Sequence, residues 1–151
     1  RAIETLRLEK GYRAWGADIG PDHSPLMAGL GWAVKLKRDI PFLGREALVK
    51  QGKTRLPRLL ACFTVDDPDI VLLGRETIFR NGQRVGWLTS AGFGHTLQKF
   101  IGYGYVRDPE NGVTADQVLA GAYELEVATE RVPASVSLKP LYDPGMTRIK
   151  A

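Results

Sequence analysis

Residues suited to ligand binding gather in the first third of the chain. Residues 6–19 read LRLEKGYRAWGADI, and residues 25–32 read PLMAGLGW. Guanidinium groups pair with carboxylates, and the faces of large aromatic rings stack on flat ligands. Core packing alone does not require so much charge, aromatic surface and glycine in so short a stretch. The pattern predicts a region that binds or holds something, with the candidates Arg7, Lys10, Tyr12, Arg13, Trp15 and Trp32.

Groups that could catalyse a reaction are not arranged in a familiar motif. The segments TSAG at 89–92 and GHT at 94–96 lack the spacing of a nucleophile elbow, so hydrolase chemistry is not expected. His23 reads as a solvated residue among turns, and His95 has no second histidine, cysteine or acidic cluster nearby, so no metal site is predicted. The paired glycines at 92 and 94 and at 102 and 104 lie in extended stretches, so this segment is not expected to bind FAD.

Charge and cysteine content argue against several classes of protein. The net charge is +4, but the basic residues are scattered, with only loose clusters at 35–38 and 53–58. No aromatic platform or helix-turn-helix pattern accompanies them, so we expect no nucleic-acid partner and read both clusters as solvated surface or as a collar that attracts an anionic ligand. No apolar run approaches the ~18 residues of a membrane span, so no membrane partner is expected. Cys62 is the only cysteine, which suits a reducing compartment and predicts a small buried hydrophobe in a strand.

The first half of the chain alternates helix, turn and strand signals. Good helix formers at 2–10 precede Gly11, which is typical of a helix C-terminus. Dense turn residues follow at 20–25, and alternating apolar residues at 29–36 predict a half-buried strand. Residues 45–51 read as a short helix. The opening segment is therefore expected to have mixed α and β structure.

The second half consists of short extended runs separated by turn residues. Strands are predicted at 59–65, 100–106, 122–128 and 132–138, with a hairpin of 76–79 and 84–88 around Asn81-Gly82. Six or so strands at this spacing indicate a small antiparallel barrel or sandwich. The predicted fold is an α+β tail over residues 1–55 followed by an all-β domain over residues 56–151, with the boundary in the polar connector at 51–57.

Several ordered blocks resemble one family along essentially the whole chain. The segments at 6–16 and 25–30, together with VG at 85–86, TS at 89–90 and GYGYV at 102–106, are similar to the C-terminal part of the folate-binding aminomethyltransferases, the glycine cleavage T-protein-like family. The blocks YRAWG at 12–16, PFLGREAL at 41–48 and PLYDP at 140–144 are most similar to its sarcosine and dimethylglycine dehydrogenase branch. The resemblance implies the C-terminal β-barrel of that family.

The resemblance also implies a function for a longer parent protein. Such a parent is a flavoprotein with an N-terminal FAD-binding oxidase module and a C-terminal tetrahydrofolate module. The flavin oxidises an N-methyl amine to an iminium, and the folate captures the one-carbon unit as methylenetetrahydrofolate. In the family, the aspartate that assists folate chemistry and the glutamate that recognises the pterin lie upstream. No catalytic residue is therefore expected here, and this piece is expected to be inactive alone while forming one wall of the folate site.

Trp32 lies where the T-protein pattern has a folate-contacting tryptophan, and its indole suits stacking on the aminobenzoyl ring. A core tryptophan on the inward side of a strand is an equally weighted alternative. Cationic donors for a carboxylate are offered by Arg7, Lys10 and Arg13. For Arg7, pairing with Glu4 within the helix is the favoured alternative.

The remaining site candidates have structural alternatives that we favour. Tyr12 and Trp15 line a ligand cavity or cement the first helix to the β domain, and cementing is preferred. Arg148 is a candidate anion contact because the tail of relatives folds back near the folate opening, but surface arginine is the simpler reading. Ile3 replaces a folate-contacting arginine of the T-protein pattern and Met27 replaces a usual glutamate, so those two contacts do not transfer.

Two other functions stay open at this point. One is a stand-alone aminomethyltransferase of the glycine cleavage type, and the other is a structural or regulatory module in which the fold is kept without the chemistry. Because the chain begins with Arg1 and enters a helical pattern at once, we expect an excised piece whose partners are upstream domains of the same polypeptide and a small-molecule folate. The expected location is the cytoplasm of a bacterium or the mitochondrial matrix.

Overall fold

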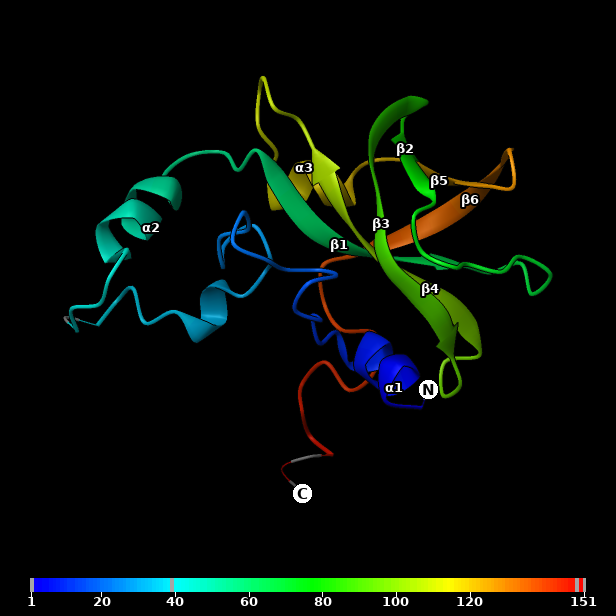
Figure 1. The fold of residues 1–151 in the computed structure, drawn as a ribbon, viewed down its shortest axis with the longest axis horizontal. Helices are drawn as coiled ribbons and strands as arrows, with labels where there is room; N and C mark the ends of the chain where they lie inside the picture. Colours follow the sequence, from blue (N-terminus) through cyan, green and yellow to red (C-terminus); the bar gives the residue numbers. More distant parts are fainter. Residues whose placement is uncertain (1, 39, 149, 151) are drawn as a thin grey trace.

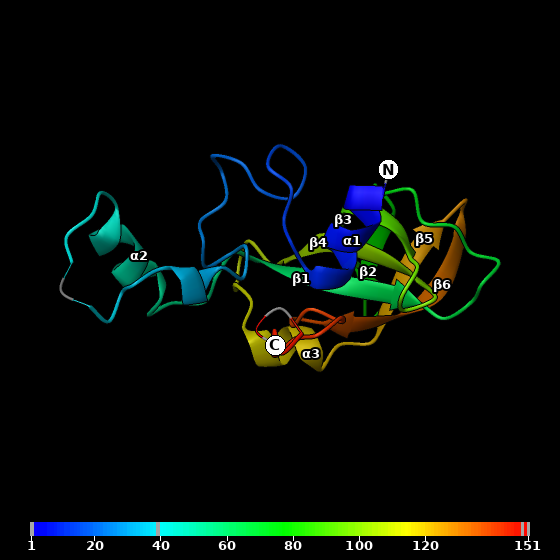
Figure 2. The ribbon, with the colours of Figure 1, turned by 90° about the horizontal axis from the view of Figure 1, so that it is seen from below.

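The computed structural model describes residues 2–38, 40–148 and 150, and its centre is a β-barrel (Figure 1). Helix α1 (Ala2–Lys10) lies against the barrel, and the chain then runs through the 3-10 helix η1 (Gly31–Ala33) to helix α2 (Arg45–Gln51). The barrel strands are β1 (Arg58–Val65), β2 (Thr77–Arg80), β3 (Gln83–Gly94), β4 (Lys99–Arg107), β5 (Tyr123–Val127) and β6 (Glu130–Ser137), and helix α3 (Ala115–Leu119) precedes β5. Figure 2 shows α2 at the end of an arm that extends away from the barrel.

The six strands close on themselves in the order β1-β4-β3-β2-β5-β6, and every pair is antiparallel. Alternate residues of β1, namely Leu59, Ala61, Phe63 and Val65, fill the barrel interior. The residues between them, Leu60 and Cys62, belong to a second apolar cluster that includes Leu8 of α1. Because both faces of β1 are covered, its sequence reads as an almost unbroken apolar run instead of an alternating one. The predicted closed antiparallel barrel and the buried position of Cys62 are thus confirmed.

The hairpin of β2 and β3 turns at Asn81 and Gly82, as predicted. Both residues have positive φ, at 51° and 78°, which is the backbone that this tight turn requires. A register shift between Ile78 and Phe79 bends the ribbon. A second shift between Leu88 and Ser90 bends β3 where it pairs with β4. Irregularities of this kind increase local twist and help a short sheet to close into a barrel.

Helix α1 is fixed to the barrel through an acidic side chain as well as through Leu8. Glu9 is buried, with 2% of its surface exposed. Its carboxylate accepts hydrogen bonds from the backbone N–H groups of Thr96 and Leu97, at 2.7 and 2.9 Å, and from the Thr96 hydroxyl at 3.0 Å. The helix therefore holds the turn between β3 and β4. The division predicted near residue 55 stays a prediction, while α1 packs directly on β3 and β4.

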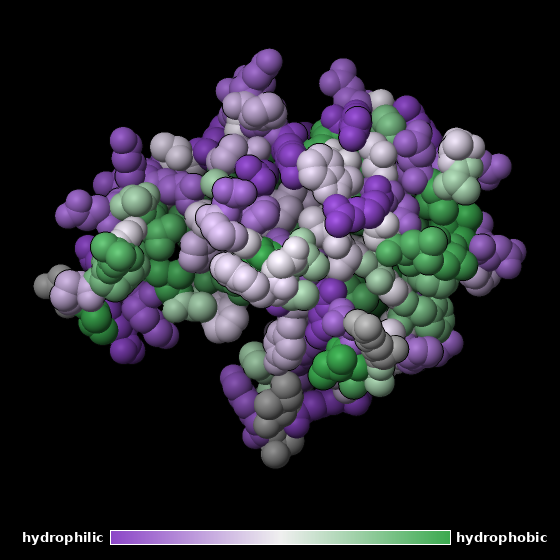
Figure 3. All heavy atoms as spheres, viewed as in Figure 1, coloured by the Kyte–Doolittle hydropathy of each residue, from purple (hydrophilic) through white to green (hydrophobic). Residues whose placement is uncertain are grey.

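The arm between η1 and α2 exposes apolar side chains. No residue of α2 is buried, and Ile40, Phe42 and Leu43 are exposed by 51%, 38% and 103%. Figure 3 shows the corresponding apolar surface around α2. Contiguous apolar surface of this kind is typical of a site that meets another protein, a ligand or a membrane.

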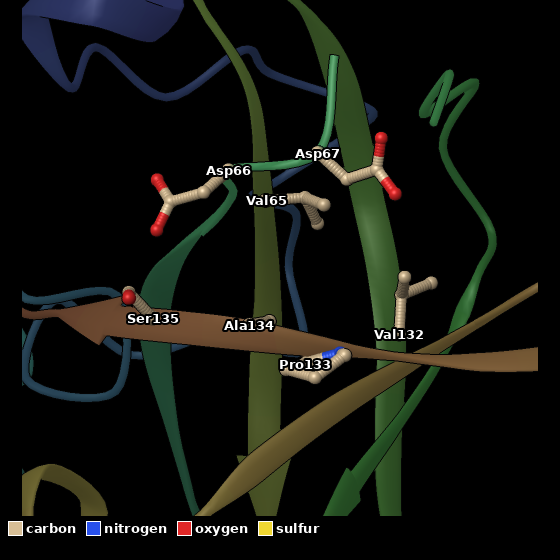
Figure 4. Close-up of a pocket in the computed structure, with 7 residues that line it drawn as sticks. All are labelled: Val65, Asp66, Asp67, Val132, Pro133, Ala134 and Ser135. Carbon is tan, nitrogen blue, oxygen red and sulfur yellow. The ribbon is translucent and has the colours of Figure 1, made fainter. Parts of the chain in front are cut away.

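The barrel seam between β1 and β6 is short. Only three residue pairs join these strands, and beyond Thr64 the chain leaves β6 and opens a hollow of about 320 Å³ at the barrel end (Figure 4). Asp66 and Asp67 lie at this hollow, and their carboxylates point in opposite directions. Asp66 pairs with Lys99 at 2.5 Å. The two aspartates therefore do not form a joint metal or acid–base site.

One strand prediction was wrong and one helix was missed, and the structure shows the physical reason for each. Residues 29–36 form turns and η1 instead of a strand, because Gly29 has a positive φ of 67° and the backbone closes local hydrogen bonds such as Leu30 N–H to Pro25 O at 2.7 Å. Trp32 is 77% exposed, so the core-tryptophan alternative is excluded. Helix α3 was missed, although Thr114 and Gln117 form a capping box in which the Thr114 hydroxyl accepts the Gln117 N–H and the Gln117 side chain accepts the Thr114 N–H.

The close approach of β3 and β4 requires glycine at position 86. A Cβ added to Gly86 would clash with the backbone carbonyl oxygen of Tyr105, an atom that cannot rotate away. We expect Gly86→Ala to lower the free energy of unfolding by roughly 1–3 kcal/mol because of this overpacking. Urea unfolding followed by circular dichroism measures the change. Gly145→Ala is the control, since its nearest atom would lie 3.5 Å from the new Cβ, and equal stability losses in both variants would contradict the packing argument.

Candidate functional site

A cavity of about 580 Å³ lies between the N-terminal segment and the C-terminal tail. We call it the tail cavity. One wall comes from the end of α1 and the loops before η1, and the other comes from the segment after β6. Its lining residues are Lys10, Gly11, Tyr12, Arg13, Ile19, Gly29, Leu30, Trp32, Leu138, Lys139, Pro140, Asp143, Pro144 and Met146. Its size is within the ~300–1,000 Å³ range of small-molecule sites.

Two aromatic side chains at the tail cavity are free to meet a ligand. Tyr12 is 53% exposed and Trp32 is 77% exposed, while Leu30 and Ile19 beside them are only half-buried. Large aromatics left in water lose the apolar burial that they would gain in a core. Exposed aromatic rings in a lining that also contains apolar side chains suit a flat aromatic ligand. The tail cavity therefore offers stacking surface rather than catalytic groups.

The Lys10–Asp143 ion pair fastens the tail to α1 and closes one side of the tail cavity. Lys10 Nζ donates to Asp143 Oδ2 at 2.9 Å and to the Asp143 carbonyl at 2.8 Å. The other oxygen, Oδ1, accepts the Thr147 N–H at 2.8 Å and its hydroxyl at 2.9 Å. Hydrogen bonds from Lys10, followed by those from Thr147, lower the pKa of Asp143 from 3.8 to about 2. Lys10 is thus committed to the tail.

Arg13 is committed to the backbone of the opposite wall. Its Nε donates to the Ala28 carbonyl at 3.0 Å, and its Nη1 donates to the Gly11 carbonyl. These bonds hold the turn after α1 against the segment that leads to η1. The side chain therefore shapes the tail cavity and presents positive charge beside it. Its sequence position suggested instead a guanidinium free to donate to a ligand carboxylate.

A buried carboxylate organises the loop between α1 and η1. Asp18 is 0% exposed, and its Oδ2 accepts Arg7 Nη1 at 2.6 Å and the Ala14 N–H at 2.9 Å. Its Oδ1 accepts the hydroxyls of Thr89 at 2.5 Å and Ser90 at 2.6 Å, both on β3. Every lone-pair direction of the carboxylate is thus in use, which is what burial of a charge requires. This network ties α1, the loop and the barrel together.

We expect Arg7→Ala to reduce the free energy of unfolding by roughly 3–5 kcal/mol, because it leaves the buried Asp18 carboxylate without its ion-pair partner. Asp18→Ala is expected to cost less, because the partly buried Arg7 keeps its pairing with Glu4. The double variant is expected to lose less than the sum of the two. Urea unfolding of all four proteins gives the coupling energy.

Glu4→Ala serves as the control. Glu4 also pairs with Arg7, at 3.0 Å, but its side chain is 49% exposed, so a loss of about 1 kcal/mol or less is expected. Additive losses for Arg7 and Asp18 would contradict their coupling.

Acid should release the tail. Because the folded pKa of Asp143 is about 2 and its ordinary value is 3.8, the stabilisation from this carboxylate is complete above 3.8 and is lost as the pH falls through about 2. Asp143→Asn lacks this contribution, so the difference in melting temperature from the unmodified chain should be largest near neutral pH and shrink between about pH 4 and pH 2. The exposed Asp116→Asn is the control, and a difference independent of pH would contradict the assignment.

The structure brings some predicted site residues together and separates others. Tyr12 and Trp32 line the tail cavity, and neither Arg7, Trp15 nor Arg148 is part of its lining. Arg7 pairs with Glu4 as the favoured reading said, but its shorter bond is to Asp18. Arg148 donates to the Tyr142 hydroxyl at 2.9 Å. The preferred cementing role of Trp15 and Tyr12 is wrong, since Trp15 is 74% exposed and Tyr12 more than half exposed.

Several organising residues were not found from sequence. His23 is not simply solvated: its ring stacks on Tyr105, with centroids 4.6 Å apart and planes at 20°. Asp18 and Asp143 lie in segments that the sequence analysis singled out, but their roles could not be predicted because key partners, Thr89 and Lys10, lie 71 and 133 positions away in the chain. The TS pair at 89–90 was noted as a family block and as part of a segment without nucleophile-elbow spacing, not as a partner of a buried carboxylate. Thr89 and Ser90 are neighbouring hydroxyl residues in a strand, and both donate to Asp18. Such a pair is the one feature of the sequence that could have indicated a buried acceptor.

Catalytic and metal-binding alternatives find no support in the described residues. These contain no group of three or more histidine, cysteine or acidic side chains that could hold a metal ion. Burial raises the pKa of the Cys62 thiol to about 12, so it is not a thiolate nucleophile at neutral pH. None of the helices in the described part of the chain has the length and apolar character to cross a membrane.

The closed barrel with its covering N-terminal segment defines an aminomethyltransferase-type C-terminal barrel. The structure of glycine cleavage system aminomethyltransferase T from Bartonella henselae superposes with a TM-score of 0.78 and 28% identity, over 95% of this chain and 38% of that one. The family model "Glycine cleavage T-protein C-terminal barrel domain" matches residues 58–143, and "GCVT N-terminal domain" matches residues 1–38. The chain belongs to the glycine cleavage T-protein family.

Two curated relatives extend the comparison beyond that solved structure. Mitochondrial sarcosine dehydrogenase of Mus musculus is 51% identical over 151 residues, which cover 99% of this chain and 16% of the relative. Mitochondrial dimethylglycine dehydrogenase of Mus musculus is 38% identical over 152 residues, covering 99% of this chain and 17% of the relative. The chain thus spans about a sixth of the length of these dehydrogenases.

Proposed function

We propose that the chain is the C-terminal portion of a tetrahydrofolate-dependent flavoenzyme that demethylates an N-methyl amine such as sarcosine or dimethylglycine. In this proposal the tail cavity is one wall of the folate site. The observation that supports this proposal most is the tail cavity, whose lining contains the exposed aromatic rings of Tyr12 and Trp32 together with apolar side chains. The similarity to sarcosine and dimethylglycine dehydrogenases over nearly the whole chain supports the substrate class.

The chemistry of the lining suits the middle and tail of a folate rather than its reactive end. Trp32 and Tyr12 can stack on the aminobenzoyl ring. The positive charges of Arg13 and of Lys139 favour the approach of a carboxylate, although Arg13 already donates to backbone carbonyl groups. Tetrahydrofolate supplies the nitrogen that accepts the one-carbon unit. Among the described lining residues, Asp143 is the one carboxylate, and it is neutralised by Lys10, so no free carboxylate is available there as a base. The chain alone is therefore proposed to be inactive.

The other candidate folate contacts are proposed to contribute less to folate binding. Arg7, Trp15 and Arg148 lie outside the lining of the tail cavity, and two of them already have protein partners, Asp18 for Arg7 and Tyr142 for Arg148. FAD is proposed to bind the parent chain only. The described residues offer no glycine-rich turn that opens a helix, since Gly92, Gly94, Gly102 and Gly104 all lie within β3 or β4.

The partner that the surface favours is the preceding part of the same polypeptide. The relatives are about six times as long as this chain, and Ile40, Phe42 and Leu43 of the arm are exposed. Figure 3 shows apolar surface around α2. An arm that buries nothing of its own is stabilised when a neighbouring domain covers it. The proposed location is the mitochondrial matrix or the bacterial cytoplasm, and the mouse relatives carry the word mitochondrial in their names.

The folate site is tested by replacing Trp32 in the parent protein. We expect Trp32→Ala to weaken tetrahydrofolate binding roughly tenfold or more, because the stacking surface is lost. Isothermal titration under anaerobic conditions measures the affinity. Leu73→Ala, at an exposed apolar residue outside both the tail cavity and the arm, is the control and should leave the affinity unchanged. Trp15→Ala ranks the outlying candidate. Unchanged affinity in Trp32→Ala would contradict the site.

The same parent proteins distinguish the alternative functions. Oxidation of sarcosine or dimethylglycine, with formaldehyde released when tetrahydrofolate is absent and trapped when it is present, supports the proposed flavoenzyme. Aminomethyl transfer without amine oxidation would indicate a stand-alone aminomethyltransferase. The absence of both activities and of folate binding would indicate a structural or regulatory module.

A further inference from the structure

Two arginines lie directly opposite each other at one end of the barrel wall. Arg58 begins β1 and is the Cα partner of Arg107, which ends β4. Side chains opposite each other in an antiparallel pair have Cβ atoms about 4.5–5.5 Å apart, and like charges in this position repel. Within the described residues neither guanidinium forms a salt bridge, and both arginines are half-buried. The pair is an uncompensated positive charge that small solutes can reach.

An aromatic plane and a histidine complete this group. The Arg107 guanidinium carbon lies 3.9 Å from the centroid of the Trp87 ring on β3, which fixes the plane of the guanidinium. His23 stacks on Tyr105, and Tyr105 precedes Arg107 by two positions on β4. Residues two apart in a strand face the same side. The histidine therefore lies over the same barrel face as the arginine pair. We call Arg58, Arg107, His23 and Trp87 the arginine cluster.

Polar atoms of the arginine cluster lack partners. Arg107 Nε is shielded from solvent and forms no hydrogen bond with the described residues. His23 Nδ1 is also shielded and has only the Gly20 backbone beside it as a weak partner. Buried polar atoms in folded proteins are nearly always paired. Burial, followed by the charge of Arg58, lowers the pKa of His23. Arg107 lowers this pKa further, whereas the Asp22 carboxylate raises it. Burial, and then Arg58, also lower the pKa of Arg107. The site is rich in donors and positive charge and poor in acceptors.

We propose that the arginine cluster binds an oxyanion, a phosphate or carboxylate group that lies between Arg58 and Arg107 and accepts hydrogen bonds from both. Guanidinium groups match two oxygens of such an anion in a bidentate arrangement, and Trp87 holds one of them in position. A bound anion also favours the protonated form of His23, whose nitrogen then becomes a donor. The cluster shares no residue with the tail cavity, so the inference is independent of the folate proposal.

Nuclear magnetic resonance tests the site directly, since His23 and His95 are the two histidines of the chain. The chain is titrated with inorganic phosphate, and separately with succinate, against sodium chloride at matched ionic strength. We expect a saturable change in the imidazole signals of His23 with an upward shift of its titration midpoint, while the His95 signals stay in place. Stronger binding of phosphate assigns a phosphoryl ligand, and stronger binding of succinate assigns a carboxylate ligand. The absence of a change, or an equal change with chloride, overturns the proposal.

Charge variants separate anion binding from a structural role. Arg58→Gln is expected to weaken binding of the preferred anion roughly tenfold, whereas Lys53→Gln, which removes the same charge from the connector before β1, should not change it. In chloride buffer without oxyanions, Arg58→Gln should raise the melting temperature because the repulsion with Arg107 is gone. The preferred anion should raise the melting temperature of the unmodified chain but not of this variant. A lower melting temperature of Arg58→Gln in chloride would show that the arginine is structural and would overturn the proposal.

Discussion

The buried carboxylate of Asp18 is the interaction on which the rest of the arrangement depends. A charge without solvent is tolerated only when ion pairing and hydrogen bonds replace its hydration. Here Arg7 comes from α1, the Ala14 N–H from the loop itself, and the Thr89 and Ser90 hydroxyls from β3. One carboxylate thus requires three parts of the chain to be in place together. The direction in which the chain leaves α1, and with it the position of Tyr12 at the tail cavity, follows from this requirement.

The barrel shows the same dependence from the other side. Its outer face along β1 and β4 is apolar and would be exposed without α1 and the following loop, as Leu60, Cys62, Tyr103 and Tyr105 pack with Leu8. The Tyr105 hydroxyl donates to the Asp18 carbonyl at 2.9 Å, so the apolar contact and the polar network meet at one residue. The tail is joined by Lys10, the last residue of the same helix. Helix α1 therefore connects barrel, loop and tail, and the tail cavity exists because all three are held to it.

Much of the fold could be predicted because it is specified locally. The hairpin at Asn81 and Gly82 depends on backbone conformations that these residues adopt readily, and α1 ends at Gly11 with a φ of 73° for the same reason. The strand predicted at 29–36 failed because alternation alone does not make a strand when no neighbouring strand is available to pair with it. The missed α3 was within reach, since its capping box is readable in the sequence. The site was predicted in part: Tyr12 and Trp32 line one cavity, and Arg7 pairs with Glu4 as favoured, but the bonds of Arg7 to Asp18 and of Lys10 to Asp143 were not predicted.

The sequence by itself determined the family, the antiparallel barrel and the absence of familiar catalytic motifs, because these follow from ordered blocks, strand spacing and short-range turn chemistry. Only the tertiary structure decided which charged residues form ion pairs within the protein and so are not free to bind a ligand. The pairs Asp18 and Arg7, Lys10 and Asp143, and Arg58 and Arg107, the last without an acidic partner among the described residues, differ little as residues in a sequence. Their roles depend on contacts between positions far apart in the chain and on the loss of solvent around them, and neither quantity is defined until the barrel has closed.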